Sequence, residues 1–175
     1  MGLGRVLAVP RPSANFAYLW GMRWLWLVSI GILWAQPEKY PPAQTFPKFL
    51  LYTLDDKPFT EKDLPPAPRG RIVIFFDPYC DHCQKQAALL AENPKALDGI
   101  QLIWVSTETS AALADFREKY LKKLPNVIVL RDKDFRFDSY FGYSVAPTIY
   151  VYDKTGRLKA VHKEEVGLAT LLRDL

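Results

Sequence analysis

An apolar run that leads into a closely spaced pair of cysteines constrains the fold of this chain more than any other feature. The run extends from Ile72 to Phe76. A continuous apolar segment of this length is typical of a strand that is covered on both faces of a sheet. Cys80 and Cys83 follow closely and open a stretch with helical character, which Pro94 is expected to end. The sequence therefore predicts a buried strand that delivers two cysteines to the start of a helix.

The other patterns continue this alternation of strand and helix. Apolar side chains at three- and four-residue spacing predict a helix between Leu113 and Leu124. A last helix is expected to begin with Glu164 and Glu165, because acidic residues favour a helix N-terminus. The pattern indicates an α/β fold with a mixed central sheet, flanked by helices and extended by an N-terminal strand. Further strands are predicted over residues 49–54, 100–105, 127–130, 148–152 and 158–161, the last two forming a hairpin.

Residues 1–35 differ from the rest of the chain in charge and hydropathy. They contain three arginines and no acidic residue, and an apolar run follows Arg23 and ends at Ala35. A positive residue, a short apolar core and a terminal small residue are typical of a secretory signal peptide. As a helix, residues 24–35 would extend only about 18 Å, less than the roughly 30 Å of a bilayer core. We expect an exported, periplasmic or otherwise extracytoplasmic protein, whose leader is cleaved after Ala35 or kept as a membrane anchor, with Met22 as a second candidate start.

Beyond this leader the sequence is that of one nearly neutral domain. The whole chain has 23 basic and 19 acidic side chains, and three of the basic ones lie in the leader, which leaves 20 against 19. No basic block is long enough to follow a phosphate backbone, so nucleic acid is not an expected partner. Four prolines predict an extended lead-in over residues 36–48. Residues 49–175 are long enough for a single domain with its own core.

The cysteine pair favours thiol–disulfide exchange. A thiolate is the reactive form of cysteine, and the N-terminal end of a helix stabilises negative charge through its free N–H groups and its dipole. We expect Cys80 to be the exposed nucleophile and Cys83, one turn inward, to be the resolving thiol. His82 is predicted to stabilise the thiolate as a cation and Asp81 to oppose it, which places the reduction potential between about −270 and −120 mV.

A metal centre is not expected. A structural zinc site needs about four ligands, and the only cysteines and histidines of the chain are Cys80, Cys83, His82 and His162. His82 lies between the cysteines, where it is poorly placed to share their ion. His162 stands alone near the end of a predicted strand and is expected to be a surface residue.

Two segments give the chain a resemblance to the thioredoxin superfamily, and within it to the exported oxidoreductases related to the cytochrome-maturation thioredoxins and the redoxins. Residues 75–84 resemble the active-site segment of that family, and residues 145–148 resemble its cis-proline loop. The resemblance implies that Tyr79, Ala146 and Pro147 contact an extended substrate, with Pro147 against the cysteines. It further implies thiols or disulfides of exported proteins as substrates, a separate electron donor or acceptor, and the disulfide of the cysteine pair as the redox group, with no other cofactor.

The chain departs from the family pattern at three positions near the cysteines. Tyr79 stands where many members have tryptophan. Ile74 replaces the buried acid of thioredoxins, and Gln86 replaces the acid of the cytochrome-maturation members. The family pattern implies that these acids help to deprotonate the resolving thiol. Asp77 and Asp81 are the remaining candidates for that role, although Asp77 also fits a simple turn residue.

Two other functions stay open. A peroxiredoxin-like thiol peroxidase would need a threonine three residues before its reactive cysteine, where this chain has Asp77. A Cu(I) carrier would hold its ion with Cys80, Cys83 and His162, although copper-carrying relatives have a wider cysteine spacing. Consumption of hydrogen peroxide would support the first function. Stoichiometric copper uptake that is lost in His162→Ala would support the second.

Overall fold

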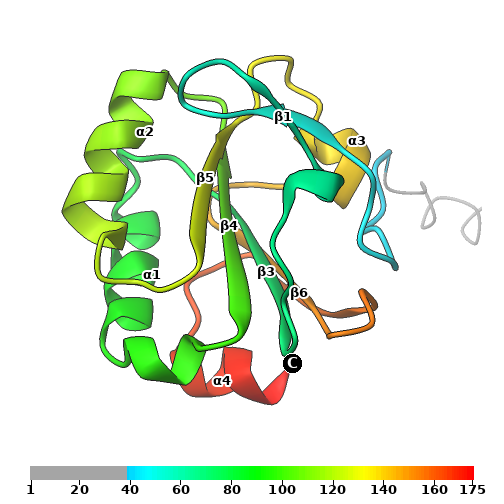
Figure 1. The fold of residues 1–175 in the computed structure, drawn as a ribbon, viewed down its shortest axis with the longest axis vertical. Coiled ribbons are helices and arrows are strands. Elements are labelled where there is room, and N and C mark those ends of the chain that lie inside the picture. Colours follow the sequence, from blue (N-terminus) through cyan, green and yellow to red (C-terminus); the bar gives the residue numbers. More distant parts are fainter. Residues whose placement is uncertain (1–38) are drawn as a thin grey trace, which may run out of the picture. The chain divides into compact units, whose positions relative to one another are not determined.

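The computed structural model describes residues 39–175, which fold around a seven-stranded sheet (Figure 1). The strand order is β2-β1-β5-β4-β3-β6-β7. Strand β3 lies near the middle, parallel to β4 and antiparallel to β6, so the sheet is mixed. The strands are β1 (Leu50–Tyr52), β2 (Pro58–Thr60), β3 (Gly70–Phe75), β4 (Ile100–Ser106), β5 (Val127–Arg131), β6 (Thr148–Tyr152) and β7 (Leu158–His162).

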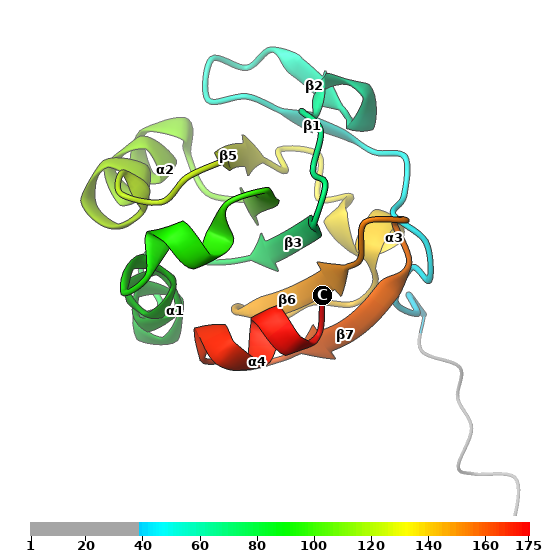
Figure 2. The same cartoon turned by 60° about the horizontal axis from the view of Figure 1, so that its bottom comes forward.

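Helices cover both faces of this sheet, as the continuous apolar strands require (Figures 1 and 2). Ile72 and Ile74 pack in one core cluster with α1, α2 and α4, while Val73 faces the opposite cluster with α3. This alternation follows from the two-residue period of a strand. The helices are α1 (Asp81–Ala91), α2 (Ser110–Phe116), α3 (Phe137–Phe141) and α4 (Leu168–Arg173), with short helical segments at η1 (Glu61–Asp63), η2 (Pro94–Leu97) and η3 (Arg117–Leu121).

The core on the α1 side contains a cluster of large aromatic rings just below the cysteine turn. Trp104 of β4 is fully buried and packs edge-on against Phe76, with ring centroids 5.2 Å apart. Phe116 of α2 contacts the Phe76 ring with a centroid distance of 4.6 Å. Aromatic pairs at these separations add to the burial energy of the rings. Phe76, the first residue after β3, is thereby fixed before the chain turns into α1.

The sequence-based expectation for the last helix is wrong at its start. Helix α4 begins at Leu168 and is preceded by Gly167 as its N-cap, whereas Glu164 and Glu165 lie in the loop before it. The side chain of Gln86 binds both backbone groups of Val166, so that neither is free to form a helical turn. The acidic pair therefore belongs to a loop beside α1 and not to a helix.

Three further elements differ from the sequence-based expectation. The expected strand over residues 49–54 is shortened to β1, and it pairs with an unexpected edge strand, β2. Helix α3 was not expected either. The predicted helix between Leu113 and Leu124 is present, but its second half, η3, is π-helical. A π turn holds one more residue than an α turn, which changes which side chains face inward.

The lead-in is extended and hydrogen-bonded to the domain over its described part, residues 39–48. The Ala43 N–H donates to the Phe141 carbonyl at 3.1 Å, and the Phe46 N–H donates to the Gly156 carbonyl at 2.7 Å. The predicted leader, residues 1–35, lies outside the described residues. From Lys39 to the C-terminus, no helix has the length and apolar character needed to cross a bilayer.

Candidate active site

The turn between β3 and α1 is held by hydrogen bonds around Asp77. Its side-chain oxygen Oδ1 accepts from the Tyr79 N–H at 2.7 Å, and its carbonyl accepts from the Cys80 N–H at 3.1 Å. An aspartate that binds the backbone two residues on is a common turn device. Asp77 is thus a turn residue, which was one of its two expected roles. The turn places Cys80 at the N-cap of α1.

The two cysteines differ sharply in exposure. Cys80 is partly exposed, and its Sγ lies 3.8 Å from the carbonyl oxygen of Ala146. Cys83 is completely buried on the inner side of α1. Both are free thiols in this structure. An external disulfide can therefore reach the sulfur of Cys80, whereas Cys83 is reached only through Cys80.

Burial dominates the ionisation of Cys83. It raises the pKa of the Cys83 thiol to about 12, and hydrogen bonding with Cys80 and the negative charge of Asp77 act in the same direction. A hydrogen bond with the backbone of Asp77 partly offsets these effects. The Cys83 sulfur is therefore protonated at neutral pH, as expected for a buried thiol without a neighbouring cation.

The loop opposite Cys80 is fixed by side-chain hydrogen bonds at both ends. The peptide bond between Ala146 and Pro147 is cis. Thr148, which is fully buried, donates its hydroxyl to the Val145 carbonyl at 2.6 Å and accepts from the Val145 N–H at 3.0 Å. Upstream, the Ser144 hydroxyl donates to Asp138 Oδ1 at 2.6 Å. These bonds hold the Ala146 carbonyl against the sulfur of Cys80.

His82 makes an ion pair that the sequence did not reveal. Its Nδ1 lies 2.6 Å from Oε2 of Glu165, which is in the loop before α4. A hydrogen bond with its own backbone holds the pKa of Glu165 below its usual value, and the contact with His82 acts in the same direction. Sequence reasoning treated His82 as a partner of the Cys80 thiolate alone. The two residues are 83 positions apart, so no local pattern could have indicated this pair.

Gln86 fastens the same loop to α1. It is completely buried; its Nε2 donates to the Val166 carbonyl at 3.1 Å, and its Oε1 accepts from the Val166 N–H at 2.7 Å. Gln86 therefore satisfies the backbone N–H and carbonyl of Val166, as a neighbouring strand would.

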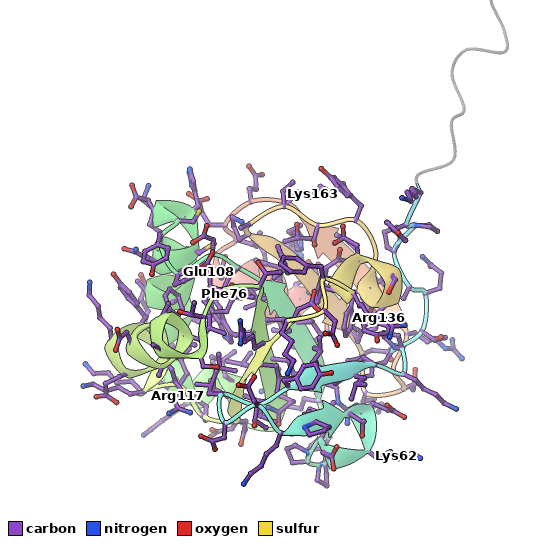
Figure 3. The ribbon with its side chains drawn as sticks, turned by 90° about the horizontal axis from the view of Figure 1, so that it is seen from above. Lys62, Phe76, Glu108, Arg117, Arg136 and Lys163 are labelled. Atoms are coloured by element: carbon purple, nitrogen blue, oxygen red, sulfur yellow. The ribbon has the colours of Figure 1, made fainter. Side chains whose placement is uncertain are left out.

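An open groove of about 550 Å³ lies between this loop and the cis-proline loop. Figure 3 labels Lys163, which lines this groove, and Phe76, which directly follows β3. The lining side chains carry both charges. They are His82, Ala146, Pro147, Lys163, Glu164 and Glu165.

The comparison with protein families covers most of the described chain. The sequence profile described as the AhpC/TSA family matches residues 42–161, which is more than half of the protein. This chain belongs to the AhpC/TSA family. The match starts in the lead-in and includes both the cysteine turn and the cis-proline loop. Comparison with curated proteins gave no match.

Solved structures share the fold of this AhpC/TSA chain. A secreted disulfide oxidoreductase of Mycobacterium tuberculosis, homologous to DsbE of E. coli, has a TM-score of 0.59 and 20% identity, covering 73% of this chain and 96% of that one. A thioredoxin-like protein from Aeropyrum pernix has a TM-score of 0.61 and 17% identity, covering 73% of this chain and 89% of that one. The peroxidoxin BcpB of Mycobacterium tuberculosis has a TM-score of 0.61 and 17% identity, covering 76% of this chain and 94% of that one. The thioredoxin fold predicted from the sequence is confirmed.

The remaining predicted site residues of the AhpC/TSA chain lie around the cysteine turn. Tyr79 is 72% exposed and borders a second, smaller hollow of about 200 Å³ against α2. Asp81 is exposed at the start of α1. Ile74, where thioredoxins carry an acid, is fully buried in the same apolar cluster as Cys83. No carboxylate therefore takes the place of that acid on β3.

His162, which was expected to be a surface residue, is partly exposed. Its Nε2 lies 2.9 Å from Oδ2 of Asp174 near the C-terminus, a contact that the sequence did not indicate. Within residues 39–175, no group of three or more His, Cys, Asp or Glu side chains is arranged to hold a metal ion. The histidine assigned to a possible copper site thus has another partner.

Proposed function

We propose that this protein is a thiol–disulfide oxidoreductase that exchanges disulfides with exported proteins. The carrying observation is the contrast between its two sulfurs: Cys80 is accessible at the N-cap of α1, and Cys83 is sealed one turn behind it. Membership of the AhpC/TSA family supports a thiol oxidoreductase or peroxidase in the broader sense. The buried neighbour makes exchange through a Cys80–Cys83 disulfide the better fit, with no other redox cofactor.

The reaction proceeds in two successive thiol–disulfide exchange steps. The Cys80 thiolate attacks one sulfur of the substrate disulfide, forms a mixed disulfide and releases the other substrate sulfur as a thiolate. Cys83 then loses its proton and attacks the Cys80 sulfur, which closes the Cys80–Cys83 disulfide and frees the second substrate thiol. The substrate disulfide is reduced and the protein dithiol is oxidised. A separate redox partner then reduces the protein disulfide back to the dithiol. When the same steps run in the reverse direction, the protein oxidises the thiols of a client.

The groove beside Cys80 is the proposed binding site for an extended client segment. The carbonyl of Ala146 faces the sulfur of Cys80, and both Ala146 and Pro147 line the groove. Tyr79 adds an exposed aromatic ring on the other side of the turn. We place this reaction outside the cytoplasm, on the basis of the predicted leader over residues 1–35, with residues 24–35 as a tether if the leader is retained. The expected clients are exported proteins with thiols or disulfides.

The test is turnover of a disulfide substrate by the purified full chain. Wild type should catalyse the reduction of a protein disulfide in the presence of a dithiol, and Cys80→Ser should abolish the reaction. Cys83→Ser should instead accumulate a mixed disulfide with the client through Cys80, which mass spectrometry identifies. Equal activity of wild type and Cys80→Ser would overturn the proposal.

A thiol peroxidase is the second candidate, because the matched family supports that type of enzyme as well. The position three residues before Cys80 holds Asp77, whose carboxylate is engaged by the Tyr79 N–H. Asp77 therefore offers no hydroxyl at the position where a peroxidase of this type is expected to have a threonine. Hydrogen peroxide consumption by the reduced protein, faster than its exchange with disulfides, would favour this candidate over the first.

A further inference from the structure

The loop before α4 is attached to the active-site helix at two points. Gln86 binds the backbone of Val166 in the interior, and His82 binds the carboxylate of Glu165 at the surface. His82 and Gln86 lie one turn apart on α1, so that they face the same loop. The buried bond fixes the loop, and the fixed loop presents Glu165 to the imidazole that adjoins the cysteines.

The position of Glu165 is well determined by these contacts. Its side chain is 29% exposed, compared with 59% for that of His82. Both residues line the groove beside Pro147. The carboxylate is therefore held by the imidazole at the groove that is proposed to receive the client.

We propose that Glu165 is a positioning residue that acts on Cys80 through His82 and thereby sets the reduction potential of the Cys80–Cys83 pair. This inference rests on the proposed function. Glu165 accepts a hydrogen bond from the imidazole Nδ1, which orients the ring and offsets its positive charge. A charged His82 alone would stabilise a thiolate at Cys80. The ion pair of His82 and Glu165 stabilises the thiolate less, because the carboxylate offsets the charge of the ring.

The direction of the effect follows from the charge of the two redox forms. The dithiol form can carry a thiolate at Cys80, but the disulfide form carries none. A nearby cation therefore favours the dithiol and makes the pair more oxidising, and a nearby anion has the opposite effect. By offsetting the His82 charge, Glu165 makes the protein more reducing than its cysteine turn alone would be.

The effect depends on pH, because a histidine side chain loses its charge between about pH 5 and 8. In the pH range where a histidine ring is charged, removal of the Glu165 carboxylate leaves that charge without an offsetting anion. Above that range the ring has no charge for the carboxylate to offset, so the same removal should change the equilibrium less. The other charged groups near the pair are Lys85 on α1, which acts on Glu165, and Lys163 and Glu164, which line the same groove. Asp81 precedes His82 directly in the chain.

The experiment is a redox equilibrium of the full chain with glutathione. The protein disulfide reacts with two glutathione thiols to give the protein dithiol and one glutathione disulfide. Glu165→Gln, which keeps a hydrogen-bond acceptor for the ring, should shift this equilibrium about three- to tenfold towards the dithiol at pH 6.0 and less than twofold at pH 8.5. A tenfold shift corresponds to about 30 mV for this two-electron couple.

Three variants separate this role from a merely structural one. In a His82→Asn background, Glu165→Gln should leave the equilibrium unchanged, because the charge through which it acts is absent. Glu164→Gln removes an adjacent carboxylate that lines the same groove without contacting the ring, and it should shift the equilibrium less than twofold. His82→Asn alone should remove most of the pH dependence, which provides a readout even if Glu165→Gln folds poorly.

The outcomes distinguish this inference from the proposed function. If the wild-type disulfide does not exchange with glutathione, the proposed function fails. If wild type exchanges but Glu165→Gln has the same equilibrium constant at pH 6.0, only the role of Glu165 is wrong. An equal shift from Glu165→Gln in the wild-type and His82→Asn backgrounds would also overturn it, because the carboxylate would then act without the imidazole.

Discussion

Gln86 of α1 and Val166 of the loop before α4 pair through two hydrogen bonds, with the glutamine side chain completely buried. The bonds join residues that are 80 positions apart. They make the position and the hydrogen bonding of the loop depend on one side chain of the active-site helix. This connection makes the stability of the loop and the chemistry of the cysteine turn testable by single substitutions.

Gln86→Met should lower the free energy of unfolding by about 1–3 kcal/mol, because both backbone groups of Val166 lose their partner. The two side chains have similar volume, so little of the loss arises from packing. A urea titration of reduced protein measures the change. Lys85→Met on the same helix is the matched control and should stay within about 0.5 kcal/mol of wild type. Equal losses from both substitutions would contradict the role given to Gln86.

Gln86→Glu should make stability depend on pH. A buried carboxyl that faces the Val166 carbonyl has its pKa raised, because the protonated form can donate where the charged form is repelled. A folded-state pKa above the unfolded value of about 4.3 means that stability is full below that value and is lost as pH rises through the folded pKa. The variant should match wild type at pH 4 and be less stable at pH 7. Urea titrations at the two pH values would refute this if the difference from wild type were constant.

The raised pKa of Cys83 should make the reduced protein sensitive to alkali. Its unfolded-state value of 9.0 rises to about 12 in the folded protein, so the folded state keeps a proton that the unfolded state loses. The unfolding free energy of the dithiol form should fall as pH rises above 9, with a slope of at most about 1.4 kcal/mol per pH unit. The disulfide form has no such proton and is the control. Parallel curves for the two forms would be inconsistent with the burial of Cys83.

Thr148→Val should loosen the loop that faces Cys80. The substitution keeps the shape of the side chain but removes both hydrogen bonds to Val145 in a fully buried place. We expect a loss of about 1–3 kcal/mol in unfolding free energy, and a lower rate constant for exchange with a protein disulfide. Thr53→Val removes only an exposed hydrogen bond to the Lys57 N–H, so it should change neither the unfolding free energy nor the exchange rate constant in this way. If the exchange rate of Thr148→Val equals that of wild type, the loop does not position the client.

Tyr79→Ala should weaken the exchange with protein clients more than the exchange with glutathione. The ring is largely exposed beside the cysteine turn, so its removal should change the unfolding free energy by less than about 0.5 kcal/mol. Loss of an exposed aromatic contact should raise KM for a protein disulfide about three- to tenfold. Phe135→Ala removes an exposed ring of similar size from the turn before α3 and is the control. Similar KM changes in both variants would exclude a specific contact by Tyr79.

The parts of the fold that could be predicted are those with local signals. The apolar run from Ile72 to Phe76 needs cover on both faces, and its residues pack into core clusters on both faces of the sheet, as expected. Cys80 at the helix start was predictable, because strand, turn and helix are contiguous there. In the structure Cys80 is the N-cap, so the helix itself begins one residue later, at Asp81.

The missed elements depend on contacts that are distant in the sequence or too short to show a period. Helix α3 has five residues, and Asp132 holds its first turn by accepting from the N–H groups of Arg136 and Phe137. Five residues cannot show helical periodicity. Strand β2 begins with Pro58, which is tolerated because this strand lies at the edge of the sheet.

The positions of the two cysteines and of the proline loop could be predicted from the sequence, but the partners of the residues around them could not. The cysteines and the cis-proline loop carry recognisable motifs. The partners of His82 and Gln86 come from a loop whose two glutamates have the composition of a helix start. Only the folded chain brings this loop to α1, so the acid that faces His82 could not be identified from spacing.

The complete burial of Cys83 also limits the order of events during turnover. If the protein exchanges disulfides as proposed, the client that is reduced and the donor that restores the dithiol both have to react at Cys80, because Cys83 is buried. The two partners would then compete for the same face and could not be bound together. Steady-state kinetics should accordingly follow a ping-pong scheme, in which each partner in excess inhibits the half-reaction of the other.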